Sequence, residues 1–301
     1  MFSKKWLKIT AIYLGLALIL VLFALYVHGH PSVIDELKHL KLWLLLVLLF
    51  GYGLVLLALM GINNAILSFC AKPLKNKENM LLTIYSTLSN FFMPLQSGIG
   101  VRSAYVKSKH KVPVFAYIKS SLIYFTIYSL ISCVMIFATG HYFWFILPGI
   151  AFVSLISYAV IKFANKRFSK KHKAVELDIS RTKLSRLILF TLGYVLIQSA
   201  IYFIELYQVS GNLNPLRAIS YTGAADFSIF VSLTPGAIGF REAFLALSKR
   251  MHGFSNSQIL AANIIDRGVF LVFLGGLIIV MLSTHALTRF NSNKSANTTK
   301  V

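Results

Sequence analysis

Acidic residues are scarce in this chain of 301 residues, since nine Asp and Glu stand against thirty Lys and Arg. So few carboxylates leave little material for two-carboxylate or carboxylate-metal catalysis. The two cysteines, Cys70 and Cys133, lie far apart without a CxxC spacing, which argues against a disulfide framework or a zinc site. The sequence also lacks HExxH, GxSxG, P-loop and dinucleotide-binding motifs. We therefore predict no catalytic residue, no metal and no cofactor, and treat both cysteines as packing residues.

Long apolar blocks fill most of the chain, and 57% of its residues are hydrophobic while 13% are charged. A hydrocarbon core about 30 Å thick needs roughly 20 apolar residues per helix. The formal net charge of +21 comes from bases between these blocks, so it indicates membrane topology and not a nucleic-acid partner. The pattern predicts an all-α polytopic membrane protein with about six spans, at residues 7–27, 42–62, 113–139, 142–162, 187–209 and 257–285.

Two further apolar stretches end in proline and glycine, which break helices. Met80–Leu95 runs into Pro-Leu-Gln-Ser-Gly-Ile-Gly before Arg102, and Ala218–Leu233 runs into Thr-Pro-Gly-Ala-Ile-Gly before Arg241. We expect both to be re-entrant hairpins that dip into the membrane and return. For the second, a spanning segment is the alternative.

The two interrupted stretches also share a short repeat. Gly100-Val-Arg-Ser-Ala-Tyr105 matches Gly239-Phe-Arg-Glu-Ala-Phe244, each with a proline four to six residues upstream. Matched positions in residues 7–139 and 142–285 predict two halves of opposite orientation, as in many secondary transporters. A chance match between two loops is the alternative.

The placement of Lys and Arg predicts the orientation of the chain, because short cytoplasmic loops carry the excess of bases. Lysines 72–77 and 107–111 and the run 162–186 would then lie in the cytoplasm. Residues 1–286 would form one transmembrane domain and 287–301 a polar cytoplasmic tail. Both termini would be cytoplasmic, in a bacterial cytoplasmic membrane. The first span follows three lysines and is too long for a cleaved signal sequence.

Ionisable residues inside apolar segments are costly, so a chain that keeps them usually uses them. Asn263, Asp266 and Arg267 share one broad face of the last span, while adjacent Asp266 and Arg267 point about 100° apart and should not pair with each other. Arg102 and Arg241 lie beside the broken segments, where freed backbone N–H groups and a guanidinium fork suit a phosphate. Packing across helices, and kinked loops with interfacial arginines, are the structural alternatives.

These motifs resemble the lysylphosphatidylglycerol synthase transmembrane region, a flippase-like family. The resemblance rests on Asn90-x3-Pro-x3-Gly-x-Gly-x-Arg102, on Leu233-Thr-Pro-Gly-Ala-Ile-Gly-Phe-Arg-Glu242, and on Asp266-Arg267. It implies movement of an anionic or aminoacylated lipid, such as lysyl-phosphatidylglycerol. With Asp226 and Asn263 added from the residues themselves, the candidate lipid-binding or transport residues are Pro94, Gly98, Gly100, Arg102, Asp226, Pro235, Gly236, Gly239, Arg241, Glu242, Asn263, Asp266 and Arg267.

The resemblance leaves three functions open. The first is a lipid flippase, with an anionic membrane phospholipid as partner. The second is a membrane component of phosphatidylglycerol lysylation that acts with a separate lipid-modifying enzyme, because we expect no lysyltransferase domain in these residues. The third is an ion-coupled transporter of a small solute. The sequence does not indicate an oligomeric state.

Overall fold

The computed structural model describes most of the chain, namely Val21, Leu25, His28 and residues 41–71, 73–93, 96–140, 143–168, 177–231, 234–237 and 239–298. Within these ranges the chain is helical and contains no strand, which confirms the all-α prediction. The long helices are α3 (Leu42–Ser68), α6 (Val114–Ile136), α7 (Ile146–Phe168), α8 (Arg181–Ser210) and α12 (Asn256–Thr298). The described parts of α3, α6, α8 and α12 are long and apolar enough to cross a membrane.

Leucine-rich sequence explains why these helices form and where they lie. In α3 there are 27 residues, so the helix is about 40 Å long at 1.5 Å per residue and exceeds the hydrocarbon thickness. Large apolar side chains such as Leu46 and Phe50 stay exposed, as expected of surfaces that face acyl chains. Over the most apolar 18-residue stretch of each helix, 56% is buried in α12, against 28% in α3. The apolar stretch of the last helix is therefore covered more fully by other helices than that of α3.

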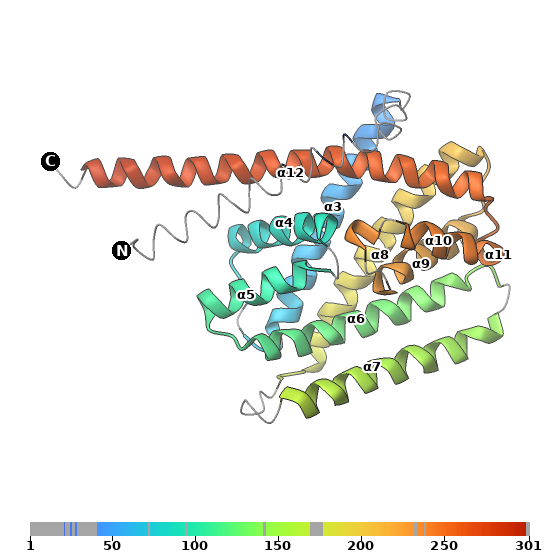
Figure 1. Cartoon of the computed structure of the whole chain (residues 1–301), viewed down its shortest axis with the longest axis horizontal. Helices are drawn as coiled ribbons and strands as arrows, with labels where there is room; N and C mark the ends of the chain where they lie inside the picture. Colours follow the sequence, from blue (N-terminus) through green and yellow to red (C-terminus); the bar gives the residue numbers. More distant parts are fainter. Residues whose placement is uncertain are drawn as a thin grey trace.

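Two pairs of shorter helices fold back on themselves between the long ones (Figure 1). The first pair is α4 (Asn76–Phe92) and α5 (Gly98–His110). The second is α9 (Pro215–Val231) and α10 (Phe240–Leu247), joined through the 3₁₀ turn η2 (Pro235–Ala237). We call these pairs the first and second hairpin. The short helix α11 (Lys249–His252) then leads into α12.

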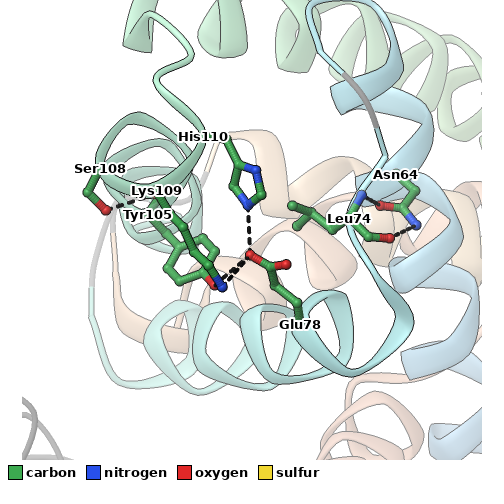
Figure 2. Close-up of polar contacts among 7 residues, drawn as sticks. All are labelled: Asn64, Leu74, Glu78, Tyr105, Ser108, Lys109 and His110. Carbon is green, nitrogen blue, oxygen red and sulfur yellow. Dashed lines mark hydrogen bonds and ion pairs between the residues drawn. The ribbon is translucent and has the colours of Figure 1, made fainter.

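The open end of the first hairpin is closed by a polar cluster around Glu78 (Figure 2). Glu78 Oε1 accepts hydrogen bonds from the Tyr105 hydroxyl at 2.7 Å and interacts with His110 Nε2 at 2.7 Å and Lys109 Nζ at 2.9 Å. Burial alone would raise the pKa of this carboxyl, but hydrogen bonds from His110, Tyr105 and Lys109 outweigh it and lower the pKa to about 2. The end of α5 is thereby held against the first turn of α4.

The predicted segments correspond to described elements with three qualifications. The predicted spans from residue 42 onward coincide with α3, α6, α7, α8 and α12, whereas the predicted span 7–27 lies outside the described residues except for Val21 and Leu25. The last helix continues to Thr298, through most of the segment expected as a polar tail. The count of six spans and the inverted repeat stay predictions.

Candidate functional site

A cavity of about 250 Å³ lies where the two hairpins meet. Residues from α3, α6, α8 and α12 complete its walls, together with residues of both hairpins. Its charged lining consists of Arg102, Arg241, Arg267, Asp226 and Asp266. With both carboxylates ionised, the described lining therefore carries one positive charge in excess.

The break of the first hairpin is held by polar side chains of α4. The Gly98 N–H donates to Asn90 Oδ1 at 2.7 Å, and the Ser97 hydroxyl donates to the Ser89 carbonyl at 2.8 Å. The first bond satisfies the Gly98 N–H, which the interruption leaves without a helical partner, and the second ties the start of α5 to the last turn of α4. Gly98 is required by space, because a Cβ there would lie 2.6 Å from the Ser86 carbonyl oxygen. Gly100 is exposed and has open space around it.

The break of the second hairpin depends on two glycines and on α12. Gly236 has φ 56° and ψ 18°, and Gly239 has φ 77°, which is the left-handed region that favours glycine. Arg267 of α12 donates to the Gly236 carbonyl at 2.6 Å and lies 3.4 Å from Glu242 Oε1. Glu242 Oε2 in turn accepts the Gly239 N–H at 2.7 Å, which caps α10. Arg267 and Glu242 therefore hold this break in shape.

The two breaks contact each other. Gln96 Nε2 donates to the Ile229 carbonyl of α9 at 3.0 Å, and a Cβ on Gly236 would lie 3.2 Å from the Phe91 carbonyl oxygen. Gln96 and Ala237, one in each break, both have a positive φ, at 49° and 57°. A left-handed backbone is costly for residues with a side chain and tends to occur at functional sites.

Arg241 and Asp266 form a buried ion pair beside the cavity. Arg241 Nη1 lies 2.6 Å from Asp266 Oδ2, and the Tyr52 hydroxyl donates to Asp266 Oδ1 at 2.5 Å. The guanidinium also lies over the ring of Tyr202, 4.9 Å from its centroid. No described group completes a hydrogen bond of ordinary geometry with Arg241 Nε or Nη2, although the Tyr221 hydroxyl interacts with the guanidinium. One arm of Arg241 is thus paired, while its buried Nε and Nη2 lack a hydrogen bond of ordinary geometry among the described residues.

The remaining predicted residues lie in different surroundings. Arg102 is buried on α5, donates to the Ser86 hydroxyl at 2.8 Å and lines the cavity, and Asp226 of α9 lines it as well. Asn263 is buried, but it is not part of the described lining. The position of Pro94 and the side chain of Pro235 lie outside what the structure describes. The expectation that Asp266 and Arg267 do not pair with each other agrees with their bonds to Arg241 and to Gly236.

Three partners of these residues were absent from the sequence prediction. Tyr52 and Tyr202 lie in α3 and α8, where a tyrosine among leucines looks like ordinary packing. Gln96 was noted only as part of the interrupted segment. A polar side chain at the break could have suggested its role, because interrupted backbone needs partners.

Comparison with known proteins agrees with this geometry. Residues 9–278 match the family described as the lysylphosphatidylglycerol synthase TM region. The chain belongs to this family. The match takes in both hairpins and α12 as far as Ile278, and together with the apolar helices it identifies an integral membrane protein of a family linked to lipid handling. No curated protein sequence matches the chain at a significant level.

Proposed function

We propose that the cavity binds the phosphate of an anionic or aminoacylated phospholipid and that the protein moves this lipid between the two leaflets. The observation that carries the proposal is Arg241, which lines the cavity with two donor groups that no described group satisfies in ordinary geometry. A buried donor without a partner costs free energy that a ligand can recover. A guanidinium donates to two phosphate oxygens at once, which a lysine cannot do.

The neighbouring arginines support the same ligand in different ways. Arg102 brings a second guanidinium to the lining from the other hairpin, and the Gly-x-Arg-x-Ala repeat places it just after its break, as it places Arg241. Arg267 is already bonded to Gly236 and Glu242, so it contributes positive charge to the cavity but few hydrogen-bond donors to a ligand. A phosphate between Arg102 and Arg241 would therefore bridge the two hairpins.

The hairpins also supply a route for movement. Their breaks meet at Gln96 and Ile229, while α4 and α9 approach this point from opposite ends of the molecule (Figure 1). We infer that the two halves are inverted repeats, with the first hairpin entering from the cytoplasm and the second from outside. Tilting one hairpin against the other would then open the same site to either leaflet in turn. A cavity of about 250 Å³ suits a headgroup, with the acyl chains remaining in the bilayer.

The experiment uses the purified full chain in vesicles that contain fluorescently labelled phosphatidylglycerol. We expect labelled lipid in the inner leaflet to become accessible to an external quencher faster than in vesicles without protein. The Arg241→Ala/Asp266→Asn double variant should lose this acceleration, because it removes the guanidinium without leaving its partner charged. Lys249→Ala removes an exposed base outside the cavity and serves as the control. Equal rates for the double variant and the wild type would refute the phosphate site.

The family description favours a second candidate, in which the chain supports phosphatidylglycerol lysylation by a separate enzyme. The described residues offer a headgroup-sized cavity but no candidate catalytic group for tRNA-dependent transfer. We therefore expect no lysyl lipid when the purified chain is given lysyl-tRNA and phosphatidylglycerol. Product above a control without protein would establish a catalytic role. Counterflow of a small solute without lipid movement would instead favour a solute transporter.

A further inference from the structure

We propose that Asp226 is a proton-binding site that couples proton uptake to the binding of an anionic headgroup, so that lipid and proton move together. This inference rests on the proposed function, and it adds the co-substrate and the energy source. A proton gradient across the membrane would then drive the lipid in one direction.

Asp226 is wholly buried on α9 and lines the cavity. The Tyr128 hydroxyl interacts with its carboxyl, but no described group completes a hydrogen bond of ordinary geometry with Oδ1 or Oδ2. A buried carboxylate without partners is costly, whereas a protonated carboxyl is neutral. The residue therefore lies in an environment where gain and loss of a proton change the free energy strongly.

The groups that face Asp226 come from four elements. They are tyrosines of α6 and α8, Arg241 of α10 and Asp266 of α12, namely Tyr124, Tyr128, Tyr194, Tyr202, Arg241 and Asp266. Arg241 is the one cation in this described set, and its Nη1 is already bonded to Asp266. Arg241 also interacts with the buried carboxyl of Glu205 on α8, so its charge is shared among three carboxyl groups.

A phosphate bound to Arg241 would directly change the charges that surround Asp226. The ligand would bring negative charge into the cavity and engage the same guanidinium that favours ionised Asp226. Like charges repel strongly in a poorly solvated site, and protonation of Asp226 removes the repulsion. Linkage requires reciprocity, so a headgroup that promotes protonation is itself bound more tightly when Asp226 is protonated.

A proton fits this position better than a metal cation. Ca²⁺ and Mg²⁺ take six or more oxygen ligands, and Arg241 would repel any second cation beside Asp226. A proton needs a single carboxyl oxygen. The tyrosine hydroxyls around the cavity could relay it, because a hydroxyl both donates and accepts a hydrogen bond.

The test measures protons directly on the purified full chain. Short-chain phosphatidylglycerol, which carries no ammonium group, is added in weakly buffered detergent with a pH indicator. We expect the wild type to take up at most about one proton per bound lipid, with sodium or potassium as the only metal ion. Asp226→Asn should abolish this uptake, and its lipid affinity should no longer change with pH. Ser228→Ala, on the same helix and outside the described lining, should retain uptake.

A second measurement does not depend on the variant folding. A hydrophobic carbodiimide modifies protonated carboxyl groups in apolar surroundings, so wild-type labelling at Asp226, located by mass spectrometry, should increase when phosphatidylglycerol is added. Lipid binding without proton uptake and without this increase would overturn the inference while leaving the proposed function intact. A requirement for sodium would also overturn it. Absence of lipid binding by the wild type would overturn both.

Discussion

Gln96 and Ile229 join the two hairpins at their breaks, through one hydrogen bond of 3.0 Å from the Gln96 side-chain amide to the Ile229 carbonyl. Gln96→Glu keeps the size of the side chain but removes the donor and places an acceptor against the carbonyl. We expect lipid movement to fall sharply and the free energy of unfolding to drop by about 1 kcal/mol, the net value of one hydrogen bond, because this bond is only partly buried. Vesicle transport and thermal unfolding of the same preparation measure both effects. Full transport by this variant would show that contact between the breaks is dispensable.

The glycines of the first motif allow a matched comparison. Gly98→Ala would place a Cβ 2.6 Å from the Ser86 carbonyl, whereas a Cβ at Gly100 meets nothing within 4 Å. We expect Gly98→Ala to destabilise the protein by about 1–3 kcal/mol through overpacking of α4 against α5. Gly100→Ala should be neutral, or stabilising by up to about 1 kcal/mol. Thermal unfolding in detergent distinguishes them, and equal losses would contradict the close approach at Gly98.

The Arg241–Asp266 pair should behave as one unit. Arg241→Ala leaves the Asp266 carboxylate buried with Tyr52 as its remaining described bonding partner, so we expect a loss of about 3–5 kcal/mol. Adding Asp266→Asn should restore much of the folded protein but not lipid movement, because the guanidinium is still missing. A double-mutant cycle, carried out once on the unfolding temperature and once on the transport rate, measures the coupling of the two side chains in stability and in lipid movement. Additive losses would mean that the two side chains do not interact.

The Glu78 cluster predicts that the stability of the open end of the first hairpin depends on pH. Because the pKa of Glu78 is lowered from 4.5 to about 2, the stabilisation is fully present above pH 4.5 and is lost as the pH falls toward 2. Glu78→Gln should remove this dependence and destabilise by about 1 kcal/mol or less, since Lys109 is largely exposed. The rate of limited proteolysis between α5 and α6, measured from pH 7 to pH 3, reports the stability of this end of the hairpin. Ser108→Ala serves as the control. Identical pH profiles for Glu78→Gln and wild type would contradict the cluster's role.

Helix positions were the most predictable part of this fold. Apolar blocks of about 20 residues have few alternatives in a membrane, so α3, α6 and α8 lie close to their predicted ranges. Proline and glycine at fixed positions indicated the two interruptions, whereas the repeat inferred from the shared Gly-x-Arg-x-Ala motif stays a prediction. The side chains that contact each break were harder to predict, because these contacts depend on packing between helices that are distant in sequence.

The pairing of the charged residues shows this limit most clearly. Helical geometry predicted that Asp266 and Arg267 point apart, but it could not tell which residue each would meet. Glu205 of α8 shows the same limit, because it is buried and one of its carboxyl oxygens has no hydrogen-bond partner among the described residues. Local spacing determines which face a side chain occupies, and only the assembled bundle determines what lies opposite that face.

The bond from Arg267 to the Gly236 carbonyl also constrains how the protein is made. Residues 215–247 leave the ribosome before Arg267 does, so during synthesis the second hairpin lacks the side chain that later satisfies its break. An interrupted backbone is poorly tolerated in acyl chains without such a partner. The second hairpin should therefore wait at the membrane surface or within the insertion machinery, and enter the bundle together with α12 as the final step of biogenesis.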